Sequence, residues 1–412
     1  MKTTTLIALG ISAYLSTQAQ AVIDTVSIGA NYTNQVWYSL QNDEQGSSAK
    51  NNWDLAFSVT GQGSNILINS VTGTKLWLYP KSDTSGWASF DTTGLYTWTP
   101  LYNSDTSWNY GAFKQNLSSN PYDVGWGIYD PITHIVTGDS LYVIKLANGI
   151  YKRLWIQKLA GGTYTFRYAN LDGTNDVTAT LVKSNYSGKN FGYYSIQNGA
   201  ALDREPPTAN WDLLFTQYTG FIPQPYNVTG VLSNIGVTVA EARGVDINNV
   251  SWTSYSFNTA MNEIGYDWKK YSGNWTIEDS LVYFVKDKTG NIWKVIFTGF
   301  GGMANGNYIF SKEKVSSVGI AEANGNNIGS IAVYPNPSNG NNINIIYNLE
   351  KTVSSVHLSV YDLSGKKLYT ENLNNTQGFY QQKLSVPKLN AGIYVVTINI
   401  DGNTIQQKLI IQ

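Results

Sequence analysis

Few residues in this chain of 412 could carry out nucleophilic or metal chemistry. The chain has no cysteine, which excludes a disulfide framework, a thiolate metal site, an iron–sulfur cluster and a cysteine nucleophile. Its two histidines, His134 and His357, are too few for a histidine-rich metal site, and neither lies near a nucleophile-elbow pattern. We expect His357, within an alternating segment, to be structural.

Two aspartates, Asp54 and Asp212, each follow a tryptophan in a segment that occurs twice, so a catalytic carboxylate has to be considered. Acid–base catalysis by a carboxylate needs a partner group nearby. The other repeated aspartates, Asp139 and Asp279, stand where strands are expected to start, and aspartate commonly caps turns there. We therefore predict structural roles for these residues and expect that the protein is not an enzyme.

The composition is that of a β-rich extracellular protein. Charged residues make up only 13% of the chain, aromatic residues also reach 13%, and there are 38 glycines. Tyrosine and tryptophan suit pleated surfaces, and glycine suits turns. The 27 basic and 28 acidic residues nearly cancel, so no electrostatic field is available to hold a polyanion. Nucleic acid is therefore not an expected partner.

Residues 1–21 are typical of a secretory signal peptide. Lys2 precedes an apolar stretch, and the small residues Ala19 and Ala21 then suit a signal peptidase. We expect the mature chain to start at Val22. No later segment approaches the ~18 consecutive apolar residues that a transmembrane helix needs, so no such helix is expected.

A duplicated module occupies most of the remaining chain. Four short segments recur in the same order, at 38–42 and 194–198, 52–57 and 210–215, 139–141 and 279–281, and 162–166 and 306–310. The first pair reads YSLQN and YSIQN, and the second reads NWDLAF and NWDLLF. The duplication predicts two tandem domains, residues 22–184 and 185–315, each close to an ordinary domain in size.

Alternating apolar segments in both copies predict antiparallel strands. Leu141–Leu146 is followed by an Asn-Gly turn and a second segment, and Leu281–Lys286 is followed by a Gly-Asn turn and a second segment. These turn residues supply the positive φ angles of tight hairpins. Helical periodicity is hard to find, apart from a short candidate at 239–243. The fold class is therefore predicted to be all-β.

The end of the chain differs from the duplicated module. Residues 316–330 are rich in serine, glycine and asparagine, which indicates a linker. Residues 331–412, called the tail below, alternate through short segments separated by regular turns. This pattern predicts a small immunoglobulin-like β-sandwich.

The tail resembles the C-terminal sorting domain of the type IX secretion system of Bacteroidetes. The resemblance rests on three motifs in order: YPNP at 334–337, VYDLSGK at 360–366 and LNAGIYVV at 389–396. It implies that the type IX secretion machinery is a partner. It also implies that the protein passes the periplasm and the outer membrane to become secreted or surface-held.

The duplicated module resembles the HmuY-like family, all-β haem-binding proteins of the same bacteria. The resemblance rests on the Trp-Asp segments at 53–57 and 211–215 and on a lysine-bearing hairpin that ends in a G-x-h-x-F strand, at 283–310 in the second copy. It implies two tandem HmuY-like domains and haem capture through axial ligands in loops. An imidazole nitrogen or a thioether sulfur would donate to the iron.

The resemblance places the haem ligands between the Trp-Asp segment and the late hairpin. In the first copy the only histidine or methionine there is His134, and in the second it is Met261. Met303 comes later, in a glycine-rich turn, and is a weaker match. No copy holds a pair of such ligands, so a site would use one strong protein ligand. Apart from haem, no cofactor and no metal ion is expected.

A second class of function stays open beside haem capture. Eight tryptophans lie in the middle regions of the two copies, at positions 77, 87, 98, 108, 126, 252, 268 and 275. Aromatic faces stack on sugars as readily as on porphyrin. The alternative is therefore an aromatic-rich, adhesin-like surface module that binds glycans or another protein. The sequence does not choose the ligand, and it leaves surface attachment and oligomeric state open.

Overall fold

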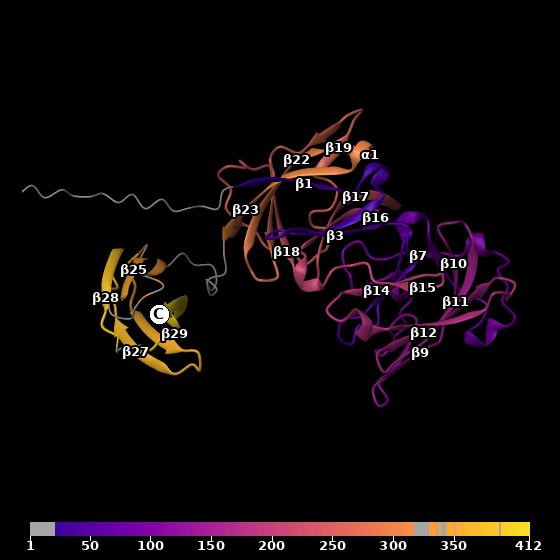
Figure 1. Ribbon diagram of the computed structural model, residues 1–412, viewed down its shortest axis with the longest axis horizontal. Coiled ribbons are helices and arrows are strands. Elements are labelled where there is room, and N and C mark those ends of the chain that lie inside the picture. Colours follow the sequence, from indigo (N-terminus) through magenta and orange to yellow (C-terminus); the bar gives the residue numbers. More distant parts are fainter. Residues whose placement is uncertain are drawn as a thin grey trace, which may run out of the picture. The chain divides into compact units, whose positions relative to one another are not determined.

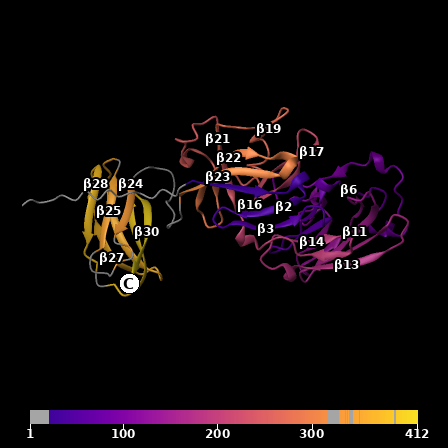
Figure 2. The ribbon, with the colours of Figure 1, turned by 45° about the horizontal axis from the view of Figure 1, so that its top comes forward.

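The structure is a computed structural model. It describes residues 21–316, 329–334, 336, 338, 343–349, 351–386 and 389–412. Residues 1–20 of the signal peptide expected at 1–21, and most of the linker expected at 316–330, lie outside the described residues. The chain forms two compact units, which divide after Ser316 (Figures 1 and 2). Strands dominate both units, which confirms the all-β class.

Two large antiparallel sheets carry most of the first unit. One has the order β1 (Val22–Ser27), β23 (Asn307–Ser316), β22 (Ile292–Phe300), β21 (Leu281–Lys286) and β18 (Thr238–Arg243). The other has the order β13 (Val177–Val182), β12 (Thr163–Asn170), β11 (Tyr151–Ala160), β10 (Leu141–Lys145), β6 (Lys75–Leu78) and β7 (Pro100–Leu101). At its side, β9 (Ile135–Gly138) pairs with β11 and with β8 (Gly127–Asp130). The predicted hairpins are therefore present, and the helix candidate at 239–243 is a strand.

Two four-stranded sheets complete the first unit. The first has the order β15 (Ala200–Leu202), β14 (Phe191–Ser195), β4 (Leu55–Ser58) and β5 (Ile66–Ile68). The second has the order β17 (Pro225–Ser233), β16 (Leu213–Phe221), β2 (Asn34–Ser39) and β3 (Asp43–Ala49). They are built alike. β4 and β16 each begin directly after the repeated Trp-Asp pair, and β14 and β2 each end on the repeated Tyr-Ser pair.

Short elements connect these sheets. They are β19 (Lys269–Tyr271), β20 (Trp275–Ile277), the helix α1 (Gly302–Asn305) and the 3-10 turns η1 (Ala30–Tyr32), η2 (Ser70–Thr72), η3 (Thr84–Trp87), η4 (Leu95–Thr97), η5 (Ala112–Lys114), η6 (Lys183–Tyr186), η7 (Thr208–Asn210) and η8 (Trp252–Ser254). Within the described part of the chain, no helix is long and apolar enough to cross a membrane.

The strand pairing of the first unit does not follow the expected division between residues 184 and 185. β14 lies beyond that position but pairs with β4, and β2 lies before it but pairs with β16. The N-terminal β1 likewise forms the edge of the five-stranded sheet by pairing with β23 (Figure 1). Each copy of the module therefore completes its sheets with strands from the start of the other copy.

This exchange produces two lobes, each with its own apolar core. The first lobe, residues 50–205, encloses a core that includes Phe57, Trp126 and Phe166. The second lobe, residues 22–49 and 206–316, encloses a core that includes Phe215, Trp268 and Phe310. Phe57 and Phe215 are the last residues of the two Trp-Asp segments, so the repeated phenylalanine anchors the core of each lobe.

The tail forms the second unit, a sandwich of two antiparallel sheets as predicted. One sheet has the order β24 (Gly329–Tyr334), β25 (Ile343–Leu349) and β28 (Gly378–Leu384). The other has the order β27 (Lys367–Asn372), β26 (Val356–Asp362), β29 (Gly392–Ile400) and β30 (Asn403–Ile411). Side chains from both sheets share one apolar core. His357 lies on β26, where its Nδ1 and the Asn372 side chain are 2.6 Å apart.

Candidate functional site

The repeated aspartates join the two copies of the module. The buried Asp54 carboxylate accepts hydrogen bonds from the backbone NH and the side-chain amide of Gln197, at 3.2 and 3.1 Å. Asp212 accepts from the backbone NH of Leu40 at 2.8 Å. Each aspartate therefore bonds to the Tyr-Ser segment of the other copy. Burial raises the pKa of Asp54, and these hydrogen bonds act against that rise. The contacts give both aspartates a structural role.

His134 lies in the turn between β8 and β9. Its backbone has a positive φ of 58°, and its NH donates to the carbonyl of Asp130 at 2.8 Å. The Tyr129 hydroxyl lies 2.7 Å from His134 Nδ1, so one ring nitrogen is already engaged. Among the described residues, no group hydrogen-bonds to Nε2. A hydrogen bond at Nδ1 orients an imidazole so that its Nε2 can serve as a ligand.

His134 stands at a groove of about 380 Å³. Val124, Val136 and Leu159 provide apolar wall, and Tyr122 adds an aromatic ring. Lys183 contributes a cation, and its ammonium donates to the carbonyl of Gly63 at 2.6 Å. Burial lowers the pKa of Lys183. The groove thus combines a histidine, apolar walls and a cation, which suits a flat, largely apolar ligand that carries an acid group.

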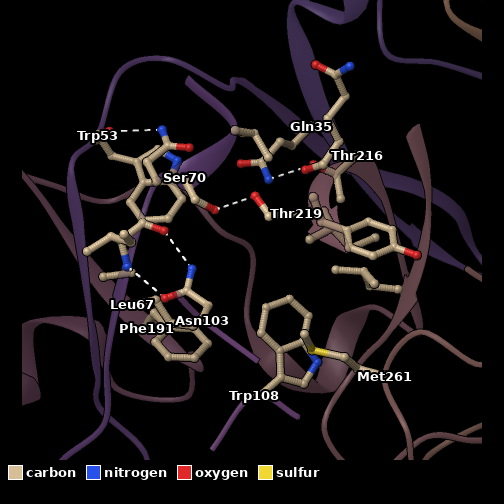
Figure 3. A pocket seen from close by; sticks show the side chains of 18 of the residues that line it. Gln35, Trp53, Leu67, Ser70, Asn103, Trp108, Phe191, Thr216, Thr219 and Met261 are labelled. Carbon is tan, nitrogen blue, oxygen red and sulfur yellow. Dashed lines mark hydrogen bonds between the residues drawn. The ribbon is translucent and has the colours of Figure 1, made fainter. Parts of the chain in front are cut away.

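Met261 lies elsewhere, in a cavity between the two lobes (Figure 3). Its side chain packs in a cluster with Trp37, Trp211 and Tyr218, and it is buried. The cavity measures about 80 Å³. This is below the ~300 Å³ at which pockets for drug-sized ligands begin. A porphyrin therefore does not fit beside Met261 without a rearrangement of the lobes.

The polar walls of this inter-lobe cavity are occupied by internal hydrogen bonds. Gln35 donates to Thr216 at 2.8 Å, and the hydroxyls of Ser70 and Thr219 are 2.7 Å apart (Figure 3). The Gln35–Thr216 bond lies within the second lobe and joins β2 to β16, whereas the Ser70–Thr219 contact joins the first lobe to the second. The cavity is therefore a packing gap at the junction of the lobes, and its polar walls are already engaged by hydrogen bonds within the protein.

Met303, the third candidate ligand, lies in α1 and its side chain is 62% exposed. It lines neither the His134 groove nor the Met261 cavity. The structure therefore places the three candidates at three separate sites. No two of them are brought together as a ligand pair. In the described part of the chain, no group of three or more acidic, histidine or cysteine side chains could hold a metal ion.

Two ionisable residues, Glu205 and Lys269, are buried although no sequence pattern indicated it. Glu205 accepts hydrogen bonds from the backbone NH of Phe191 and the hydroxyl of Tyr193, and burial raises its pKa to about 7. Lys269 lies against the rings of Trp268 and Phe300, and burial lowers its pKa to about 7. Neither residue lines the His134 groove or the Met261 cavity, so we assign both to the packing of the lobes.

Comparison with known proteins identifies the tail. Residues 332–412 match the family model of the secretion system C-terminal sorting domain, which confirms the prediction for the tail. A chain with this domain is a secreted or cell-surface protein that engages the type IX secretion machinery. The match covers the tail alone, so the HmuY resemblance of the first unit and the signal peptide stay predictions.

Other comparisons add no argument about the first unit. No curated protein matches the chain. A solved structure titled "Biofilm associated protein - BSP domain" aligns with 100% of this chain and 84% of its own, at 9% identity and a TM-score of 0.18. The C. elegans fusion protein EFF-1, as a truncated trimeric ectodomain, aligns with 97% of this chain and 93% of its own, at 8% identity and a TM-score of 0.17. These TM-scores are too low for a shared fold.

Proposed function

We propose that the first unit captures a ligand outside the cell without catalysis, and that this ligand is haem bound at the His134 groove. The observation that carries the proposal is the Tyr129–His134 hydrogen bond, since it orients the imidazole and leaves Nε2 available at the groove. The apolar walls would cover porphyrin, and Lys183 would face a propionate. The resemblance to the HmuY-like family supports the same ligand.

The proposal uses one protein ligand. Among the residues that line the groove, His134 is the one histidine or methionine, so it alone would supply a strong ligand to the iron. A single strong ligand on ferric iron leaves it high-spin or mixed-spin. The spectrum of the complex should therefore differ from that of a bis-histidine site. Met261 is a secondary candidate, because its cavity would first have to open.

A haemin titration of the purified chain tests the proposal. We expect a Soret shift that saturates at one haem per chain and that is lost in His134→Ala. Tyr129→Phe should weaken binding without abolishing it, because it removes only the bond that orients the ring. The matched control is His357→Ala in the tail, which should bind as the unmodified chain does. A flat titration, or equal binding by His134→Ala, would refute the proposal.

A further inference from the structure

A second groove lies on the first unit, apart from the His134 groove. It measures about 490 Å³ and is lined by Thr99, Pro100, Leu101, Tyr102, Asn103, Ser104, Asp105, Gln115 and Phe221. All of these belong to the first lobe except Phe221, which ends β16 of the second lobe. The groove therefore forms only when the lobes are assembled. It shares no lining residue with the His134 groove, whereas Asn103 and Ser104 also line the Met261 cavity.

Two aromatic rings form a corner in this groove. The rings of Tyr102 and Phe221 stand at 89° to each other with centroids 6.0 Å apart. Phe221 keeps 43% of its surface exposed although it is a large apolar residue. Aromatic side chains that line a concave site are a common feature of ligand-binding pockets.

The floor of the groove is held rigid by Asn103. Its amide donates to the carbonyl of Ile68 at 2.7 Å and its carbonyl oxygen accepts from the NH groups of Ile68 and Ala112, at 3.0 and 3.1 Å. Asn103 therefore ties the loop between β7 and η5 to β5. Ser104 adds a backbone bond to Tyr110 at 2.7 Å. A fixed floor reduces the entropy lost when a ligand binds.

Three polar side chains that line the groove near the two rings make no hydrogen bond to a described residue, so they are available to a ligand. No described residue hydrogen-bonds to the side chain of Thr99, Asp105 or Gln115, in contrast to Asn103, whose amide oxygen and nitrogen both make hydrogen bonds. The Asp105 carboxylate also has no cation within ion-pair distance among the described residues. The groove thus offers hydroxyl, amide and carboxylate groups, and one uncompensated negative charge that disfavours anionic ligands.

We infer that this groove binds a neutral hexose residue of a glycan. The apolar face of a pyranose would cover Tyr102 or Phe221, since aromatic faces stack on such surfaces. Its hydroxyls would donate to Asp105 and exchange hydrogen bonds with Thr99 and Gln115. Sulfated and uronic sugars are repelled by Asp105. The inference specifies the glycan-binding class that the aromatic composition indicates, and it does not depend on haem.

Calorimetric titration of the purified chain with maltohexaose, cellohexaose and laminarihexaose tests the inference, with hexagalacturonate as the anionic comparator. At least one neutral hexasaccharide should bind and the anionic one should not. Phe221→Ala and Tyr102→Ala should each weaken binding about tenfold, the loss of one stacking contact with its buried area. Asp105→Asn removes the negative charge and should allow some binding of hexagalacturonate.

Tyr226→Ala is the matched control, because Tyr226 is an exposed aromatic residue on the same β16–β17 hairpin but does not line the groove. It should leave sugar binding unchanged. Absence of binding for every neutral hexasaccharide would overturn the inference, as would equal binding by the Phe221 and Tyr102 variants or preference for hexagalacturonate. Haemin titration of the same variants should be unaffected, so failure here is distinct from failure of the haem proposal.

Discussion

The Asp54 carboxylate, in the first copy of the module, hydrogen-bonds to the second copy and should therefore stabilise both. Its side chain is 0% exposed and accepts from two groups of Gln197. Asp54→Ala leaves those donors buried without a partner, which costs about 1–3 kcal/mol. We therefore expect the free energy of unfolding to fall by that amount in urea titrations. Asp139→Ala, at an exposed aspartate, is the control and should stay within ~0.5 kcal/mol of the unmodified chain.

Glu205 makes the stability of the first unit depend on pH. Burial raises its pKa from 4.5 to about 7, so the folded state binds a proton that the unfolded state has released. Its contribution is full below pH 4.5 and is lost as the pH rises through 7. One pKa unit corresponds to ~1.4 kcal/mol, so the loss amounts to about 3 kcal/mol.

Glu205→Gln tests this dependence. Urea titrations between pH 4.5 and pH 7.5 should show a steeper fall in stability for the unmodified chain than for the variant. The exposed Glu44→Gln should follow the unmodified chain. Identical pH profiles for Glu205→Gln and the unmodified chain would show that Glu205 titrates normally in the fold.

At the scale of elements, the exchange of strands couples the start of the chain to the second lobe. Val36 in β2 faces Phe215 in β16, and Gly192 in β14 faces Phe57 in β4 at the equivalent place. Proline has no NH to donate, so it removes a ladder hydrogen bond and is not tolerated in a central strand. We expect Val36→Pro to loosen the second lobe and Gly192→Pro to loosen the first.

Hydrogen exchange measured by mass spectrometry separates these outcomes. Val36→Pro should speed exchange in β16, β22 and β23, with β10–β12 protected as before. Gly192→Pro should give the reverse pattern. Loss of protection in the first lobe on Val36→Pro would mean that the strands are not exchanged between copies. This is a direct test of the boundary expected between residues 184 and 185.

At the scale of the whole molecule, the tail and the first unit have separate cores. Deleting residues 331–412 should therefore leave the first unit folded, with its circular dichroism and thermal unfolding midpoint retained. Without the sorting domain the protein should accumulate in the periplasm. Fractionation and immunoblotting measure this. The truncated protein at normal levels in the medium would contradict the role of the tail.

Local patterns in the sequence were enough for the fold class and for the tail. Alternating apolar residues and Asn-Gly turns dictate antiparallel strands over a few neighbouring residues. Sorting motifs such as 360–366 form one strand and its turn, so they can be read without knowledge of the fold. The Tyr129–His134 contact was also within reach, because both residues lie in one hairpin of β8 and β9.

The tertiary structure alone decided which strands pair and where the grooves form. The two copies carry nearly the same Trp-Asp and Tyr-Ser segments, so β2 meets equal local complementarity in β4 and in β16. Chain connectivity and the closing of two cores select between them, and neither is encoded in a short window of residues. For the same reason the contact between Tyr102 and Phe221 could not be predicted from the sequence. The two rings come from different copies and meet only after strand exchange has joined the lobes.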